Sequence, residues 1–190
     1  DGTLDVIESA LGGEWMETIA RDARGRPKQV RWLWQPQART AWIEAARVCG
    51  LAGMSADELD PLTATSAGLG EVIRSSREAG AEHIFLFLGG SATNDGGCGM
   101  ASALGCTFRD KHGASFDPLP CNLSVLERIE RPAQKLTCKF SVLVDVRNPL
   151  LGPRGASRTY APQKGATPEM VETLEAAMEH WADVSARDLH

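Results

Sequence analysis

A strongly apolar run followed at once by a glycine-rich loop constrains the fold of this chain more than any other feature. Residues 83–88, HIFLFL, are rich in β-forming side chains, and such a run is typical of a strand buried on both faces of a parallel sheet. Residues 89–97, GGSATNDGG, follow directly, and GMASALG after them predicts a short helix. A buried strand, a glycine loop and a helix in this order indicate an α/β fold with a mainly parallel sheet.

The remaining elements repeat this alternation of helices and strands. Residues 139–146, KFSVLVDV, form a second apolar run that predicts another buried strand, next to or close to 83–88 in the same sheet. Residues 15–34 alternate as two strands, with the polar stretch RDARGRPK as the hairpin turn between them. Apolar residues at helical spacing predict helices within 1–13, 40–54, 68–80 and 167–184, the last capped by Thr167.

A polar, proline-containing stretch at residues 55–66, SADELDPLTATS, predicts a junction between two domains. Residues 1–54 contain a hairpin and helices without a βαβ unit, so we assign them to a smaller second α/β domain. Residues 55–190 are assigned to a Rossmann-like domain with a mainly parallel sheet. The chain begins without a methionine and closes on a helical pattern, which indicates a piece of a longer protein.

Composition excludes several classes of function. The net charge of −5 argues against a broad nucleic-acid surface, which requires an excess of Lys and Arg. No apolar run has the length of a membrane span, and nothing resembles a signal peptide. Five cysteines at irregular spacing, with no C-x-x-C pair, suit reduced thiols in a cytoplasm. We therefore expect a cytoplasmic protein with no nucleic-acid and no membrane partner.

The glycine loop is the first candidate for a ligand site, because ligands of open parallel sheets bind at the carboxyl ends of the strands. Glycine lets the backbone approach a ligand closely, and N–H groups at a helix start attract anions. Asp95 would repel a phosphate, so its carboxylate suggests a Mg²⁺ ligand or a base for a substrate hydroxyl. The alternative, which the pattern leaves open, is a tight turn with Asp95 as the helix N-cap.

Polar residues also follow the second apolar run. Asp145 and Asn148 come just after KFSVLV and could hold a metal or a polyol, whereas an Asx-turn before Pro149 is the alternative. Lys164 stands just before a helix start, where a cation is unfavourable for the helix, so a bound anion would explain it. A solvated surface lysine is the alternative. Ser66 precedes another predicted helix and could bind phosphate or only cap that helix.

Four motifs together resemble the glycerate kinase family of bacteria: GGSATNDGGCGMASALG, DVRNPLLGPRGAS, PQKGATPEMVETLE and TSAGLGEVI. The opening DGTLDV is similar to the tail of that family's A-D-G-G-[ED]-G-T motif, and the resemblance spans essentially the whole chain. It implies a two-domain α/β kinase with its active site in the cleft between the domains. Such an enzyme transfers the γ-phosphoryl group of ATP to D-glycerate with Mg²⁺, giving 2-phosphoglycerate or 3-phosphoglycerate.

The resemblance also implies roles for the loop residues. Asp95, Asp145 and Lys164 are the predicted catalytic residues, and the two aspartates are also the predicted metal ligands. The predicted substrate- or phosphate-binding residues are Gly89, Gly90, Ser91, Thr93, Asn94, Gly96, Gly97, Asn148 and Ser66. Both aspartates are expected to face one cavity together with Ser91 and Asn148, and their replacement is expected to lower catalysis more than stability.

The chain departs from the family in extent. Family members are longer, beginning with a strand and an A-P-D-S-F-K-like motif and ending with further glycine-rich loops, and neither segment occurs in these residues. Two other functions therefore stay open: a non-catalytic module that binds a small acid or a nucleotide, and a kinase of another small hydroxy acid. The residues also leave a homodimer, the phosphorylated position and the catalytic base open.

Overall fold

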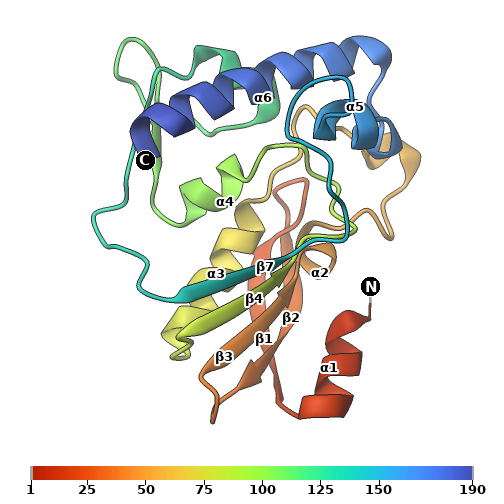
Figure 1. The fold of residues 1–190 in the computed structure, drawn as a ribbon, viewed down its shortest axis with the longest axis vertical. Coiled ribbons are helices and arrows are strands. Elements are labelled where there is room, and N and C mark those ends of the chain that lie inside the picture. Colours follow the sequence, from red (N-terminus) through yellow and green to blue (C-terminus); the bar gives the residue numbers. More distant parts are fainter. Residues whose placement is uncertain (1, 190) are drawn as a thin grey trace.

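The structure is a computed structural model that describes residues 2–189, in which helices and strands alternate (Figure 1). Asp1, which belongs to the first predicted helix and to the DGTLDV motif, and His190 lie outside the described residues. The strands are β1 (Glu14–Arg21), β2 (Pro27–Gln35), β3 (Thr40–Glu44), β4 (His83–Phe87), β5 (Thr107–Arg109), β6 (Arg128–Glu130) and β7 (Lys139–Leu143). The α-helices are α1 (Thr3–Leu11), α2 (Ala45–Cys49), α3 (Ala67–Glu78), α4 (Cys98–Ala103), α5 (Ala156–Tyr160) and α6 (Pro168–Leu189). Three 3₁₀ helices complete the order: η1 (Ala56–Glu58), η2 (Pro120–Val125) and η3 (Pro162–Lys164).

The central sheet has the strand order β1-β2-β3-β4-β7. β2 pairs antiparallel with β1 and with β3, whereas β3 pairs parallel with β4 and β4 pairs parallel with β7. Among these five strands β2 alone therefore runs in the opposite direction, which confirms a mainly parallel sheet. The prediction that 83–88 and 139–146 contribute neighbouring strands is also confirmed, with His83 opposite Lys139. β5 and β6 form a separate antiparallel pair.

The hairpin β1-β2 continues into the parallel strands through β3. Residues 40–44 lie in a stretch whose spacing predicted a helix, but they form a strand, and helix α2 occupies only Ala45–Cys49. Pairing with β4 explains the difference, because tertiary strand pairing readily overrides weak local propensity. The strands of residues 1–54 consequently share one sheet with β4 and β7. The division of the chain into two domains at residue 54 stays a prediction.

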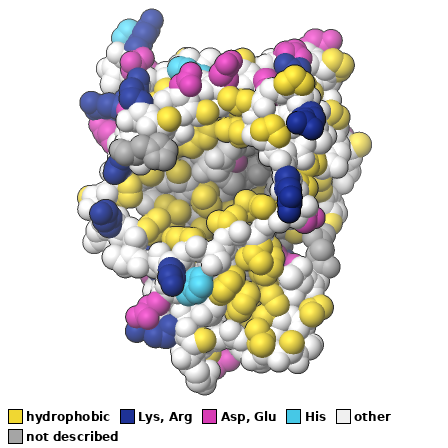
Figure 2. Space-filling view, in the orientation of Figure 1, with side chains coloured by type: hydrophobic (Ala, Val, Ile, Leu, Met, Phe, Trp, Pro, Cys, Tyr) yellow, Lys and Arg dark blue, Asp and Glu magenta, His cyan; other side chains and the backbone are white. Residues whose placement is uncertain are grey.

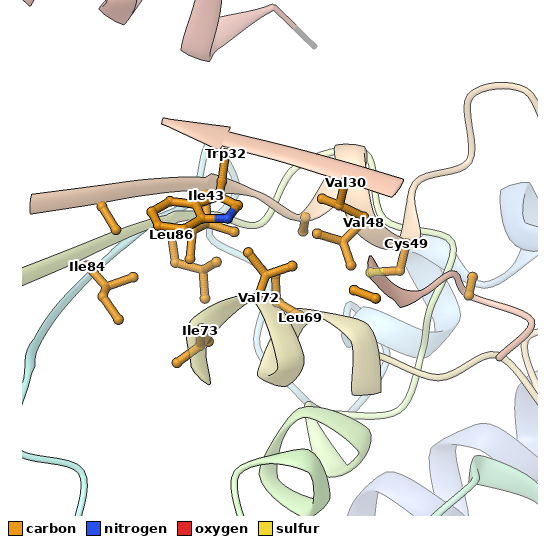
Figure 3. Packing of buried hydrophobic residues seen from close by; sticks show 14 of the residues in the cluster. Val30, Trp32, Ile43, Val48, Cys49, Leu69, Val72, Ile73, Ile84 and Leu86 are labelled. Atoms are coloured by element: carbon orange, nitrogen blue, oxygen red, sulfur yellow. The ribbon is translucent and has the colours of Figure 1, made fainter. Parts of the chain in front are cut away.

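The main core lies between this sheet and α3 (Figure 3). Leu69, Val72 and Ile73 of α3 pack against sheet residues that include Val30, Trp32, Ile43, Ile84 and Leu86. Each such side chain contributes about 1.5–3 kcal/mol when it is fully removed from water. Glycine is required on the other sides of α3, because a Cβ at Gly68 would lie 1.8 Å from the Arg21 carbonyl oxygen and one at Gly70 would lie 2.5 Å from that of Met100.

Helix α6 lies above α4 in Figure 1 and covers a second core. Its buried stripe includes Leu174, Met178 and Trp181, as the helical spacing predicts. The Oγ1 of Thr167 accepts a hydrogen bond from Met170 N at 3.3 Å, which confirms the predicted cap. Although α6 has 22 residues, no helix within residues 2–189 is both long and apolar enough to cross a membrane.

Strand β7 is not buried, contrary to the sequence-based prediction. Within residues 2–189 it stands at the edge of the sheet and pairs with β4 alone, and Val142 is 53% exposed. Strand β4 buries one face through Ile84 and Leu86, while Phe85 on the other face is half-buried and stacks on Trp42 at 4.1 Å between ring centroids. The space-filling view shows hydrophobic side chains gathered over the sheet on this side of the molecule (Figure 2).

Candidate functional site

The loops after β4 and β7 leave the sheet at the same edge. The strands are parallel and in register up to Phe87 opposite Leu143, and Leu88 N donates a hydrogen bond to the Leu143 carbonyl oxygen at 3.2 Å. The glycine loop 89–97 and the segment 144–148 therefore start side by side. This is the place where open parallel sheets bind their ligands.

A cavity of about 390 Å³ lies beside the glycine loop, and we call it the larger cavity. One part of its wall is apolar and comes from the sheet, α3, α4, α6 and nearby loops; it includes Leu69, Leu86, Leu88, Met100, Val142, Leu150 and Met178. The other part is polar and consists of Ser66, Ser91, Thr93, Asn94, Asp95 and Lys164, with glycines 96 and 97. Figure 2 shows a hollow with hydrophobic side chains around it on this face. The larger cavity thus combines an apolar flank with a polar end.

A second pocket of about 250 Å³ adjoins the polar end, directly at the ends of β4 and β7; we call it the strand-end pocket. It is lined by Leu88, Gly89, Gly90, Ser91, Val144, Asp145, Val146, Tyr160, Gln163 and Lys164. Leu88, Ser91, Tyr160 and Lys164 line both spaces, so the two are neighbours across these side chains. Most of the predicted site residues thus come together at one edge of the sheet.

Asp95 is buried, with 2% of its surface exposed, and it acts as a cap. Its Oδ2 accepts hydrogen bonds from Ser66 N at 2.8 Å, Ser66 Oγ at 2.7 Å and Gly99 N at 3.2 Å, while Oδ1 accepts one from Gly97 N at 3.1 Å. The carboxylate therefore joins the start of α3 to the start of α4. The N-cap residue of α4 is Gly97 and not Asp95, but the Asp95 carboxylate still caps the start of α4 through its bonds to Gly97 N and Gly99 N. A metal ion or a substrate proton would have to compete with these four donors.

Lys164 is also buried, with 8% of its surface exposed. Its Nζ donates a hydrogen bond of 2.5 Å to the carbonyl oxygen of Thr93 in the glycine loop. Burial lowers the pKa of the Lys164 ammonium group, and the neighbouring Cys49 and Asp95 act in the opposite direction. The alternative of a solvated surface lysine is therefore wrong. The structure places a cationic side chain against the glycine loop, between the larger cavity and the strand-end pocket.

Asn94 is held by a residue that the sequence analysis did not single out. Its Nδ2 donates a hydrogen bond to the Oγ of Ser157 in α5 at 3.1 Å, and both side chains are buried. Residues 49–51 also anchor the loop: Leu51 N donates to the Gly90 carbonyl oxygen at 2.9 Å, and Ala92 N donates to that of Cys49 at 2.8 Å. In the sequence, Ser157 is marked only by its position at the end of the family-like motif DVRNPLLGPRGAS. No sequence pattern predicts that residues 49–51 contact the glycine loop.

Asn148 does not line either space, so the prediction of one cavity shared by four polar side chains is wrong. Its Nδ2 donates to the Arg154 carbonyl oxygen at 2.9 Å and to Thr159 Oγ1 at 3.1 Å, and its Oδ1 accepts from the Tyr160 hydroxyl at 2.6 Å. These local bonds occupy the amide and fold the loop 148–160 on itself. Asp95 lines the larger cavity and Asp145 lines the strand-end pocket.

Three glycines of the loop adopt a backbone conformation that other residues avoid. Gly90, Gly96 and Gly97 have φ angles of 73°, 59° and 81°, in the left-handed region that favours glycine. A Cβ at Gly96 would lie 2.7 Å from Nε1 of Trp181, so α6 also requires a glycine there. These positions explain part of the glycine content of the loop without reference to a ligand.

The described residues contain no preformed cluster of metal-binding side chains. Within residues 2–189, no group of three or more His, Cys, Asp or Glu side chains could hold a metal ion. A magnesium ion that accompanies a nucleotide needs only one or two protein carboxylates, because phosphates and water supply its other ligands. The assignment of Asp95 and Asp145 as metal ligands stays a prediction, and the hydrogen bonds of Asp95 favour Asp145.

The sheet and the loops at its carboxyl edge define an α/β protein with a ligand site next to a glycine loop and a buried lysine. The model of the glycerate kinase family matches residues 1–190. The chain belongs to this family.

Several relatives support the assignment over the full chain. A Bacillus subtilis (strain 168) protein named glycerate kinase is 37% identical over 192 residues, covering 100% of this chain and 50% of the relative. An Escherichia coli (strain K12) protein named glycerate 2-kinase is 37% identical over 194 residues, covering 100% and 51%. A crystal structure described as glycerate kinase 2 of Salmonella typhimurium LT2 superimposes with a TM-score of 0.94 at 40% identity, covering 100% of this chain and 52% of that one. The chain thus spans about half the length of the relatives it matches.

Proposed function

We propose that a family-length polypeptide containing this chain is a kinase that transfers the γ-phosphoryl group of ATP to a hydroxyl group of D-glycerate. The observation that carries the proposal is the buried Lys164 against the glycine loop at the shared carboxyl edge of β4 and β7. The names of the relatives support the reaction, and the Escherichia coli relative named glycerate 2-kinase supports 2-phosphoglycerate as the product.

The glycine loop provides donors for an anion. Within residues 2–189, the backbone N–H groups of Gly89, Gly90 and Ser91 have no hydrogen-bond partner, although they line the strand-end pocket. Consecutive free N–H groups form a concave site that suits a phosphate or a carboxylate. Lys164 lines the same pocket, and a buried ammonium group attracts an anion more strongly than one in bulk water. Phosphoryl transfer depends mainly on such positioning and charge neutralisation.

Asp145 supplies the opposite charge at this pocket. Its side chain is exposed and has no partner within residues 2–189, so the carboxylate is available to a ligand. This donor fits a magnesium ion that also binds the phosphates of a nucleotide. When bound, the ion would neutralise phosphate charge during transfer. Asp95 contributes differently: it holds the loop through its bonds to Gly97 and Gly99.

The test is phosphorylation by a purified family-length polypeptide that contains these residues. ADP release is measured with D-glycerate, L-glycerate and tartronate, and the product is identified by ³¹P NMR. We expect turnover that depends on D-glycerate, and a decrease of roughly a hundredfold in kcat for Lys164→Met, as for loss of one group that stabilises transition-state charge. Asp145→Asn should behave similarly, whereas Asp183→Asn, an exposed carboxylate away from both spaces, is the matched control.

Three results would overturn parts of the proposal. Turnover with another hydroxy acid in place of D-glycerate would change the substrate and leave the site intact. Saturable binding of ATP without turnover of any acid would support the alternative of a binding module. Unchanged kinetics of Lys164→Met and Asp145→Asn would remove the strand-end pocket from the reaction.

Two properties of the whole protein stay predictions. The five cysteines are free thiols in the structure, which supports the expected cytoplasmic location because disulfides are rare there. A homodimer is the other prediction, and sedimentation of the family-length polypeptide is its direct measurement.

A further inference from the structure

A third pocket, of about 320 Å³, lies on the other side of the segment that Asp95 caps. Ser66 lines the larger cavity, whereas its neighbours Thr65 and Ala67 line this pocket, so residues 65–67 form a wall between the two spaces. Its lining is Arg21, Arg24, Gly25, Thr63, Thr65, Ala67, Gly99, Ser102, Asp117, Pro118 and Leu119. We call it the arginine pocket. It contains side chains that neither the fold nor the proposed reaction has used so far.

The hairpin turn between β1 and β2 brings the arginines to this wall. Thr65 N donates a hydrogen bond to the Ala23 carbonyl oxygen at 2.9 Å, which docks the turn onto the start of α3. Arg24 donates through one terminal nitrogen to the carbonyl oxygen of Glu58 at 2.7 Å. Arg21 is held by Glu71, with Nε 2.7 Å from Oε1. Both guanidinium groups are therefore positioned by bonds from distant parts of the chain.

The polar groups of the arginine pocket keep unused bonding capacity. Arg24 has no carboxylate partner within residues 2–189, whereas the charge of Arg21 is paired with Glu71. The hydroxyl of Ser102 and the carboxylate of Asp117 have no hydrogen-bond partner in the same residues. The Thr65 Oγ1 accepts a bond from Ala67 N at 3.1 Å, and its own hydrogen stays available for donation.

We propose that the arginine pocket binds a small hydroxylated anion. A carboxylate or phosphate group would pair with Arg24, since a guanidinium keeps several donors in a planar fork. Hydroxyl groups of the same ligand would donate to Asp117 and exchange hydrogen bonds with Ser102. The space is of the size of small-molecule sites and its wall is mainly polar, which favours a compact polar ligand.

The position of the pocket gives binding a consequence for the neighbouring site. A ligand on Thr65 would stand against the segment whose next residue, Ser66, donates two hydrogen bonds to Asp95. Asp95 in turn holds Gly97 of the glycine loop. If the ligand of the arginine pocket shifts residues 65–67, it would change the affinity of the glycine loop for its own ligand. Binding at the glycine loop would then change the affinity of the arginine pocket by the same factor. The proposed binding itself does not depend on kinase activity.

The test uses ¹⁵N-labelled chain of 190 residues titrated with 2-phosphoglycerate, which carries a carboxylate and a phosphate. D-glycerate and inorganic phosphate, titrated separately, show which of the two groups the pocket recognises. We expect saturable shifts of the amide signals of Gly25, Thr65, Gly99 and Ser102, with a Kd in the millimolar range or below.

Three variants make the result specific. Arg24→Gln should weaken binding at these amides about tenfold, the effect of losing one hydrogen bond to a charged group. Ser102→Ala, which keeps a helix-forming residue in α4, should weaken it several-fold. Arg74→Gln, an exposed arginine of α3 outside the pocket, removes the same charge and should leave binding unchanged.

The opposite results would overturn the proposal. Shifts confined to Gly89, Gly90 and Lys164, with affinity unaffected by Arg24→Gln, would assign all binding to the strand-end pocket. The absence of saturable shifts for all three probes, or equal weakening by Arg24→Gln and Arg74→Gln, would leave only general electrostatic attraction. A failure of D-glycerate phosphorylation would not affect the outcome.

Discussion

Replacing Asp95 by Asn should destabilise the fold strongly, because the carboxylate accepts four hydrogen bonds that connect two helix starts. An asparagine can place its oxygen at the position of Oδ2, where it still accepts from Ser66 and Gly99. Its amide group then faces Gly97 N, a donor that loses its partner. The substitution therefore keeps one of the two side-chain oxygens and removes the negative charge.

The magnitude follows from these contacts. Hydrogen bonds to a charged group contribute about 1.5–3 kcal/mol each, against about 0.5–1.5 kcal/mol for neutral partners. Three weakened bonds at about 1 kcal/mol each and one lost bond at about 2 kcal/mol sum to about 5 kcal/mol, which equals the lower end of the 5–15 kcal/mol that stabilises a typical domain. The sequence-based expectation had the opposite order, with catalysis affected more than stability, because it placed a second carboxylate and no donors beside Asp95.

The assay is urea unfolding followed by tryptophan fluorescence, with the midpoint and the slope fitted separately. Asp145→Asn is the matched control, since this exposed side chain has no partner within residues 2–189 and should change stability by less than about 0.5 kcal/mol. Equal midpoints for Asp95→Asn and Asp145→Asn would refute the structural role of Asp95. A lower midpoint at an unchanged slope for Asp95→Asn alone would support it.

Three further predictions follow from buried groups. Burial lowers the Lys164 pKa from its ordinary value of 10.5, so at a pH between the folded and unfolded pKa values the unfolded chain binds more protons than the folded one. The stability of the wild type relative to Lys164→Met should therefore rise with pH across that window. A difference in urea midpoints that does not change with pH would contradict this prediction. Burial raises the pKa of the Cys49 thiol to about 12, so iodoacetamide at pH 8 should label exposed Cys121 in the folded protein and Cys49 only after unfolding, as peptide mass spectrometry can measure. Gly99→Ala should lower stability by about 2 kcal/mol in urea unfolding despite better helix propensity, because its Cβ would lie 2.3 Å from Thr65 Oγ1; an unchanged midpoint would show that this wall can relax.

Local sequence patterns determined several of the longer elements and the edge of the sheet where the site lies, although they missed strand β3. The spacing of apolar residues and the Thr167 cap predicted helix α6, and the polar turn predicted the β1-β2 hairpin. The two apolar runs predicted parallel neighbours, so the loops at 89–97 and 144–148 had to start at one edge. These features depend on backbone geometry and on neighbours within a few residues, which the sequence displays directly.

Tertiary structure decided what each polar side chain does at that edge. Asp95 became a cap because Ser66, 29 residues away, presents two donors to it. Lys164 became buried because it bonds to Thr93, 71 residues away. Within residues 2–189, β7 is exposed at the edge of the sheet with one neighbouring strand, which is a matter of sheet order and not of its apolar composition. Burial and hydrogen-bond partners arise from long-range packing, so no local pattern distinguishes a capping carboxylate from one that is available to a ligand.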